Sequence, residues 1–175
     1  MRVVGLCGCS GSGKTTLGVG LIAALRAAGC RVSVIKHTHK RFEVDVPGKD
    51  SWRHREAGAF EVLVANRQRL VLQREFEAEA ADITVRDLLA ELVDLGDSHW
   101  VLVEGFKHAD LPRIEVWRAA CEVPVQYPHD PFVVAVASSD AAPVPTALPW
   151  LNLDDPAAVA AFLLSDPQRY ECRRD

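Results

Sequence analysis

Near the start of the chain stands Gly8-Cys9-Ser10-Gly11-Ser12-Gly13-Lys14-Thr15, which fits the phosphate-binding pattern G-x-x-x-x-G-K-[ST]. The apolar run 3–7 precedes it. A helical spacing of apolar residues follows, with Leu17, Leu21, Ile22 and Leu25. In a strand–turn–helix context of this kind, glycines let backbone N–H groups converge on an anion, and the helix N-terminus adds its dipole. A chance match would require all four fixed positions and both flanks to coincide, so the stretch predicts a nucleotide phosphate site.

Two side chains of this loop have defined roles in such sites. Lys14 would reach the β- and γ-phosphates of a nucleotide, where it is also a catalytic candidate. The hydroxyl of Thr15 would bind Mg²⁺. The loop therefore predicts two ligands, a nucleoside triphosphate and Mg²⁺.

The composition is typical of one globular domain, and we predict a single P-loop nucleotide-binding domain over residues 1–175. Of its 175 residues, 49% are hydrophobic and 25% charged, which suits a domain with a full core. A net charge of −4 without a long basic run argues against nucleic acid as a partner. No apolar run has the length of a membrane span, and the five cysteines are scattered, so we expect no membrane association and a cytoplasmic location.

The fold class follows from the elements around the loop. Residues 31–36 are largely apolar, as expected of a buried parallel strand, and Gly29 is placed to end the preceding helix. Strand, helix and strand within about 35 residues indicate a right-handed βαβ unit. We therefore predict an α/β P-loop NTPase with a mostly parallel sheet flanked by helices.

A further site candidate, an acidic residue, follows another predicted strand. Residues 100–103 are apolar and lead to Glu104 and Gly105, the form of a Walker B strand. Such a carboxylate would hold Mg²⁺ through water or polarise an attacking water. The alternative, an ordinary buried strand that ends in an acid, is weaker once a P-loop is present.

Two segments between these motifs interrupt the βα alternation. The polar loop 36–50 follows a strand end, where α/β sheets bind ligands; its His37 and His39 could bind a metal or lie near phosphate. Residues 61–66 and 69–73 predict a hairpin at an edge of the sheet or at an interface. Because its strands are apolar on both faces, we expect a symmetric dimer around it.

The rest of the chain predicts further helices and strands. Residues 84–87 indicate a capping box before a helix whose apolar face includes Val93. Strands are expected at 114–117 and 132–137, with base-reading residues at 138–140. Asp155 and Pro156 should begin a last helix, and residues 169–175 a frayed tail.

Five motifs together resemble the molybdopterin-guanine dinucleotide biosynthesis adaptor protein family, MobB type. They are Lys36-His37-Thr38-His39, Asp45-x-Pro47-Gly48-Lys49-Asp50-Ser51, Glu56-Ala57-Gly58-Ala59, Leu102-Val103-Glu104-Gly105-Phe106-Lys107-His108 and Val134-Ala135-Val136-Ala137-Ser138. The resemblance implies a homodimeric GTP-binding protein with weak GTPase activity. It also implies that the protein assists the nucleotidyltransferase that joins GMP to molybdopterin, with molybdopterin itself a possible ligand.

The resemblance also implies site residues. Residues from Gly8 to Thr16 would form the phosphate site and Glu104 the Walker B acid, while Asp45, Lys49, Asp50 and Arg53 would belong to a site loop. The sequence departs from the family pattern at Ser139, an extra serine before Asp140, and it contains no Asn-Lys-x-Asp guanine signature.

Two other functions remain open at this stage. A small-molecule kinase would need an arginine-bearing lid, for which Arg53, Arg55 and Arg67 are candidates, although no lid insertion is visible. A metallochaperone GTPase would need a dense cluster of histidines and cysteines, and His37 with His39 is a thin substitute.

Overall fold

The computed structural model describes residues 1–38, 40–76, 83–93, 95–106 and 108–172. This chain divides into two compact units, the first made of Met1–His37 and Thr84–Asp175 and the second of Thr38–Ile83. His39, Lys107 and residues 173–175 of the expected tail lie outside the described residues.

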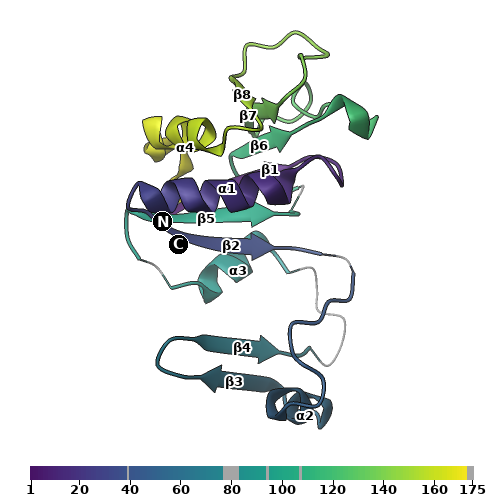
Figure 1. The fold of residues 1–175 in the computed structure, drawn as a ribbon, viewed down its shortest axis with the longest axis vertical. Coiled ribbons are helices and arrows are strands. Elements are labelled where there is room, and N and C mark those ends of the chain that lie inside the picture. The colour runs from purple at the N-terminus through teal and green to yellow at the C-terminus, as the bar shows by residue number, and fades with distance from the viewer. Residues whose placement is uncertain (39, 77–82, 94, 107, 173–175) are drawn as a thin grey trace. The chain divides into compact units, whose positions relative to one another are not determined.

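The first unit contains a six-stranded sheet in which every neighbouring pair of strands is parallel (Figure 1). In spatial order the strands are β2 (Arg31–Lys36), β5 (His99–Glu104), β1 (Arg2–Cys7), β6 (Arg113–Val116), β7 (Val133–Ser138) and β8 (Trp150–Asn152). The helices of this unit are α1 (Lys14–Ala27), α3 (Val85–Glu91) and α4 (Pro156–Ser165), with short 3-10 turns at Ala119–Cys121 and Pro167–Tyr170. The parallel sheet with its helices confirms the predicted P-loop NTPase class.

Alternation along β1 assigns the helices to the two faces of the sheet. Val4 and Leu6 belong to a core cluster with α1 and α4, which includes the fully buried Leu21 and Leu163. Val3, on the opposite face of the strand, belongs to a cluster with residues of α3. The sheet is therefore covered on both faces, as a parallel sheet requires.

The boundaries of the predicted helices follow from their capping residues. Thr84 and Asp87 form the expected capping box at the start of α3, and the Asp155 side chain accepts a hydrogen bond of 3.0 Å from the Ala158 N–H at the start of α4. Gly29 follows α1 at a φ of 82°, the left-handed conformation that ends many helices.

Three expectations about the first unit were wrong. Strand β2 is not buried, because it lies at the edge of the sheet, and Ile35 is its one buried residue. Helix α3 ends at Glu91, so Val93 lies beyond it and is 72% exposed. The described part of the tail is ordered against the sheet: Tyr170 is buried beside Trp100, and the Cys172 N–H donates to the Met1 carbonyl at 3.0 Å.

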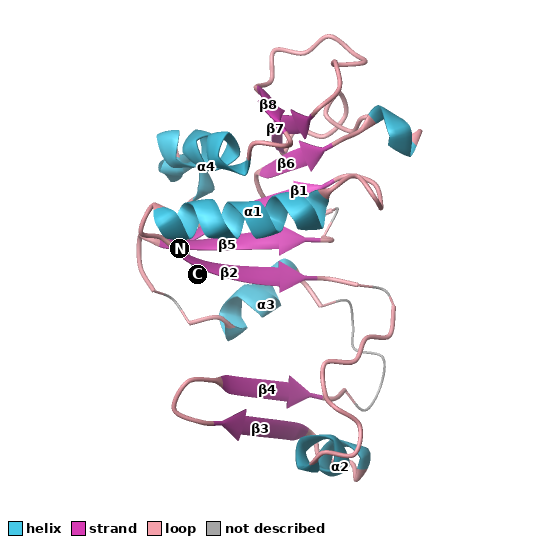
Figure 2. Cartoon of the chain, in the orientation of Figure 1, coloured by secondary structure: helices cyan, strands magenta, loops and turns pink. Residues whose placement is uncertain are grey.

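The second unit contains helix α2 (Asp50–Glu56) and an antiparallel hairpin of β3 (Glu61–Ala65) and β4 (Leu70–Arg74), visible in Figure 2. The hairpin forms a two-stranded sheet of its own, so the expectation that it lies at an edge of the main sheet was wrong: in the described part of the chain, neither strand pairs with the six-stranded sheet. Its turn is closed by the Asn66 side chain, which accepts hydrogen bonds of 2.8 Å from the backbone of Gln68 and of Arg69. This side chain explains how an Arg-Gln pair, a poor choice for a tight turn, can join the strands.

Among the described residues, no helix combines the length and the apolar composition that a membrane crossing demands.

Candidate functional site

The phosphate loop between β1 and α1 depends on three glycines with positive φ. Gly8, Gly11 and Gly13 have φ values of 130°, 82° and 103°, which residues with a Cβ rarely adopt. Gly8 is required for a second reason, because a Cβ there would overlap the carbonyl oxygen of Val116. The left-handed Gly13 is also the N-cap of α1, so the loop leads directly into the helix whose dipole favours an anion.

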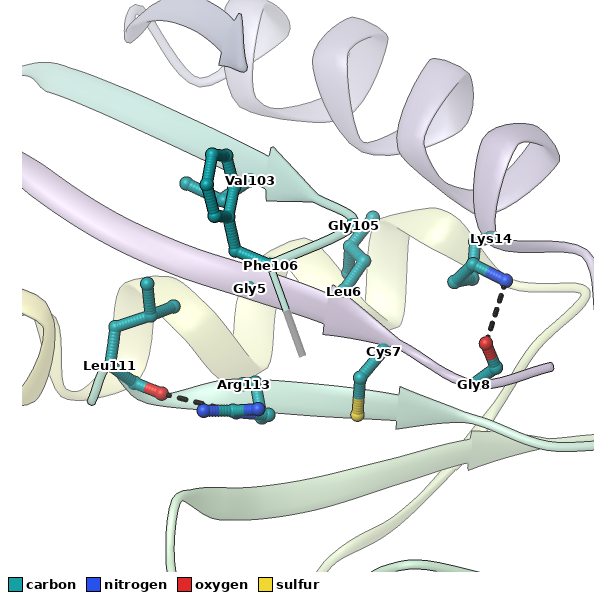
Figure 3. A pocket seen from close by; sticks show the side chains of 10 residues that line it. All are labelled: Gly5, Leu6, Cys7, Gly8, Lys14, Val103, Gly105, Phe106, Leu111 and Arg113. Carbon is teal, nitrogen blue, oxygen red and sulfur yellow. Dashed lines mark hydrogen bonds between the residues drawn. The ribbon is translucent and has the colours of Figure 1, made fainter. Parts of the chain in front are cut away.

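Lys14 folds back over this loop. Its Nζ donates hydrogen bonds to the carbonyl oxygens of Gly8, at 2.9 Å, and of Cys9, at 2.5 Å; the contact with Gly8 is drawn in Figure 3. Partial burial lowers the pKa of the Lys14 ammonium, while Cys9 and Glu104 act in the opposite direction. A partly desolvated cation over a loop of backbone amides suits a phosphate.

Glu104 joins the loop to the neighbouring strands. In the parallel registers Leu6 lies beside Glu104 and Lys36 lies on its other side, so β5 delivers the carboxylate to the carboxyl end of β1. Glu104 Oε1 accepts a hydrogen bond of 3.2 Å from the Thr15 hydroxyl, and Oε2 forms an ion pair with Lys36 Nζ. The Glu104 residue is 6% exposed, whereas the Lys36 side chain is 55% exposed.

The chemistry of these groups fits Mg²⁺. Thr15 and Glu104 supply a hydroxyl and a carboxylate oxygen, the hard ligands that this ion prefers, and they lie within hydrogen-bonding distance of each other. Few protein ligands are expected, because Mg²⁺ in nucleotide sites keeps waters and takes substrate phosphates as further ligands. The described part of the chain has no group of three or more His, Cys, Asp or Glu residues that could hold a metal on its own.

The chain beyond Glu104 is held close to the end of β2. Gly105 has a φ of 109°, and a Cβ on it would lie 2.6 Å from the His37 carbonyl oxygen. The His37 N–H donates to the Glu104 carbonyl at 2.8 Å, and the His37 ring lies 4.6 Å from that of Phe106. The position of the His37 ring is therefore explained by its packing on Phe106 and does not require a bound metal.

A small cavity of about 40 Å³ lies behind the phosphate loop (Figure 3). Its lining includes Cys7 and the largely buried Arg113, whose Nε donates to the Leu111 carbonyl at 3.4 Å. This volume is far below the several hundred cubic ångströms of a typical ligand pocket. The cavity therefore does not accommodate a nucleotide, and the candidate phosphate site is the loop surface.

The structure brings the three central candidates, Lys14, Thr15 and Glu104, into one site in the first unit. The remaining loop residues, Cys9, Ser10, Gly11, Ser12 and Thr16, lie between β1 and the first turn of α1; Ser12 is fully buried, whereas Ser10, Gly11 and Thr16 are exposed.

The site-loop candidates lie in the second unit. Asp45 Oδ1 accepts hydrogen bonds of 2.9 Å from the Val46 N–H and from the Ser51 hydroxyl. Lys49 is the N-cap of α2 and Asp50 its first residue. These contacts explain how Asp45 orders the start of α2, and its binding role, like those of Lys49 and Asp50, stays a prediction.

Two residues near the loop were not predicted to belong to the site, Lys36 and Arg118. Lys36 ends β2, and the order of the strands in the sheet, which the sequence does not specify, places it beside Glu104 at the end of β5. Arg118 follows β6, and its Nε lies 3.7 Å from where a Cβ on Gly13 would be. Its nearness to Gly13 depends on tertiary packing and has no local signal in the sequence.

A comparison with protein families matches residues 3–139 to the family described as molybdopterin guanine dinucleotide synthesis protein B. The chain is 40% identical over 162 residues to the molybdopterin-guanine dinucleotide biosynthesis adapter protein of Escherichia coli, with 91% of this chain and 90% of the relative covered. It is 42% identical over 137 residues to the protein of that name from Haemophilus influenzae, which covers 78% and 74% of the two chains.

A solved structure agrees with the sequence comparisons. The crystal structure of a MobB protein homolog from Bacillus stearothermophilus superposes with a TM-score of 0.69 at 25% identity, covering 96% of this chain and 99% of the other. The structural similarity thus extends over nearly the whole chain, including the hairpin unit.

Proposed function

The chain belongs to the molybdopterin guanine dinucleotide synthesis protein B family, and from this premise we propose that it is a GTP-binding adapter of molybdenum cofactor biosynthesis. It would assist the nucleotidyltransferase that attaches GMP to molybdopterin, and would have a weak, Mg²⁺-dependent GTPase activity. The names of the relatives support the adapter role and the guanine dinucleotide product.

The observation that carries the nucleotide-binding part is the convergence of Lys14, Thr15 and Glu104 at the end of β1. Lys14 lies over the loop, and the Thr15 hydroxyl at the start of α1 donates to Glu104 at the end of β5 at 3.2 Å. A glycine-rich turn without a binding role would not require a buried carboxylate to face the first turn of the helix. The arrangement supports binding of a phosphate chain with its metal.

Each side chain then has a physical task. Lys14 neutralises the charge of the phosphates, and the loop amides orient them. Bound Mg²⁺ would neutralise charge that develops on the phosphate oxygens during hydrolysis. Glu104 accepts the Thr15 hydrogen bond and pairs with Lys36, so the hydroxyl and the carboxylate are held in place before a ligand arrives.

The proposal includes partners and a location. The nucleotidyltransferase of the pathway is the proposed protein partner, molybdopterin a possible second ligand, and a second copy of the chain the proposed partner in a homodimer. The expected location is the cytoplasm, and neither nucleic acid nor membrane is a proposed partner.

Nucleotide binding is tested by Lys14→Ala. We expect the variant to lose measurable binding of a fluorescent GTP analogue at micromolar concentration, because a charge-assisted contact to phosphate is lost. Arg26→Ala, in the last turn of the same helix, is the control and should bind as the wild type does. Wild-type affinity in the Lys14→Ala variant contradicts the assignment.

The adapter role is tested by turnover and by partner binding. Without a partner, GTP hydrolysis should remain below roughly 1 s⁻¹, the lower end of the range for kinases, because the sequence shows no arginine lid. Immobilised protein should retain the nucleotidyltransferase of the pathway in a pull-down. Faster turnover with transfer of phosphate to a small acceptor would instead support a kinase.

A further inference from the structure

The end of β6 and the segment that follows it meet the phosphate loop at three points. Val116 lies against Gly8, since its carbonyl oxygen occupies the place of a Cβ there. Cys121 Sγ lies 4.0 Å from the carbonyl oxygen of Ser10. Arg118 lies beside Gly13, the N-cap of α1, as described above. This segment therefore forms one wall of the site.

The guanidinium of Arg118 is held through one of its three nitrogens, Nη2, within the described part of the chain. Nη2 donates to Asp154 Oδ1 at 3.2 Å, and Asp154 Oδ2 accepts a hydrogen bond of 2.6 Å from the Ser139 hydroxyl. Within the described ranges, Nε and Nη1 have no hydrogen-bond or ion-pair partner and Nη2 makes one contact, so four of the five N–H donors are uncommitted. The Arg118 side chain is 39% exposed, so these donors are accessible to a ligand.

The ion pair between Arg118 and Asp154 contributes little to the stability of the fold. The Asp154 side chain is 64% exposed, so the pair is a surface ion pair. Such pairs contribute little, because solvent screens the charges and two long side chains lose freedom. The contact with Asp154 is better explained as a device that orients the guanidinium.

Topology places this guanidinium where a ligand is expected. The chain order of the sheet reverses at β1, since β5 and β2 lie on one side of it and β6, β7 and β8 on the other. Ligands of open α/β sheets bind in the crevice at such a point, beyond the carboxyl ends of the strands. Lys36 and Glu104 border it on the β5 side, and Arg118 lies just beyond the end of β6 on the other side.

We propose that Arg118 binds the phosphate chain of the nucleotide through its free N–H donors, with Asp154 as its positioning residue. The inference rests on the proposed nucleotide binding and adds a specific contact to it. A guanidinium has two edges with parallel N–H groups, Nε with Nη2 and Nη1 with Nη2, and Asp154 takes one Nη2 proton, so one such pair stays free. A parallel pair matches two oxygens of a phosphate better than an ammonium does. Lys14 and Arg118 then hold the phosphates from two directions.

The test is calorimetric titration of GTP, in the presence of Mg²⁺, into the full-length wild type and the variants Arg118→Gln, Arg118→Lys and Asp154→Asn. Loss of a charged hydrogen bond should raise the Kd of Arg118→Gln by about tenfold or more. Arg118→Lys should recover part of the affinity, because lysine restores the positive charge but lacks the paired N–H groups of the guanidinium. Asp154→Asn should show a smaller rise, because it weakens only the orientation.

Two controls separate the possible outcomes. Arg26→Gln removes an arginine at the far end of α1 and should leave the Kd unchanged; the melting temperature of each variant without ligand shows that the fold is intact. If the wild type binds GTP, Lys14→Ala does not, and Arg118→Gln has the wild-type Kd, the Arg118 assignment is overturned while the proposed function stands. A fall in hydrolysis rate at unchanged Kd likewise overturns it, and a wild type that does not bind GTP overturns both.

Discussion

The charged side chains of the candidate site leave an excess of positive charge, which suits the proposed phosphate. Lys14 and Lys36 carry two positive charges, against one negative charge on Glu104. The two Glu104 oxygens meet Lys36 and the Thr15 hydroxyl, while Lys14 donates to the carbonyl oxygens of Gly8 and Cys9. These carbonyls are neutral partners, so we expect an anionic phosphate to replace them at a gain.

Cys7 and Cys9 stand on either side of Gly8 but in different environments. Cys7 is buried on β1, whereas Cys9 lies in the loop and is half-buried. Burial, assisted by the charge of Glu115, raises the pKa of the Cys7 thiol from 9.0 to about 12. The thiolate, which is the reactive form, is therefore scarce at this position.

We predict that iodoacetamide at pH 8 alkylates Cys7 in the folded protein about a thousandfold more slowly than in urea. A rise of about three units in the pKa reduces the thiolate fraction at pH 8 about a thousandfold, and steric protection by the fold would slow the reaction further. Peptide mass spectrometry over time measures the rate at each cysteine. Equal rates in folded and unfolded protein would contradict the burial of this thiol.

The same shift has a defined sign for stability. Folding keeps the proton on Cys7, so its contribution is fully present below pH 9 and is lost as the pH rises from 9 towards 12. The free energy of unfolding should therefore decline over this alkaline range, and Cys7→Ala should reduce the decline.

At the scale of elements, α1 and α4 pack together through a glycine. A Cβ on Gly20 would lie 2.7 Å from the Cβ of Pro156 and nearer still to its Cγ. Pro156 is the first residue of α4, and its ring cannot rotate away. Gly18, half a turn earlier in α1, is different, because the nearest atom to a Cβ there is Leu6 Cδ1 at 3.5 Å.

The two glycines give a matched pair of substitutions. Gly20→Ala should lower the free energy of unfolding by about 1–2 kcal/mol, since the strain of overpacking exceeds the gain in helix propensity. Gly18→Ala should be neutral or raise it by up to about 1 kcal/mol, because an ordinary van der Waals contact accepts the methyl group. Urea unfolding measures both, and a destabilisation of similar size in the two variants would disprove the packing argument.

Elements with a local signal were predicted well from the sequence, and those defined by packing were not. The phosphate loop and the starts of α3 and α4 contain their own glycines or capping residues, and all appear as expected. Strand β8 was not predicted, because its three residues Trp150–Asn152 follow a proline-rich loop and have no alternation to detect.

The site shows the same division. Lys14, Thr15 and Glu104 were identified because each belongs to a motif with fixed spacing. Lys36 and Arg118 were not identified. The strand order β2-β5-β1-β6 brings Lys36 beside Glu104 and Arg118 beside Gly13. Sequence neighbours do not specify that order.

At the scale of the whole molecule, the hairpin unit has apolar side chains that its own fold leaves exposed. In the antiparallel register Leu63 pairs with Leu72, and Ala65 with Leu70, so three leucines lie on one face. Leu63, Leu70 and Leu72 are 60%, 64% and 41% exposed. The opposite face is partly covered, since Val62 is buried there.

The leucine face is therefore the expected contact in the proposed homodimer. In a symmetric dimer the same patch serves both copies, so each leucine buried on one chain is buried on the other too. Full burial of an exposed leucine contributes about 1.5–3 kcal/mol, and these leucines are 41–64% exposed, so each of the six at the contact would contribute about half of that to association. Light scattering after size exclusion should thus show a dimer of the wild type at micromolar concentration.

Adjacent residues on opposite faces of β3 provide the decisive comparison. Leu63→Lys places a charge in the centre of the leucine face and should yield a monomer, because the dimer would have to bury two ammonium groups. Val64→Lys changes a residue of similar exposure, 50%, on the other face and should leave the dimer intact. A monomeric wild type, or a Leu63→Lys variant that stays dimeric, excludes the leucine face as the interface; dissociation by Val64→Lys alone would assign the contact to the opposite face of the hairpin.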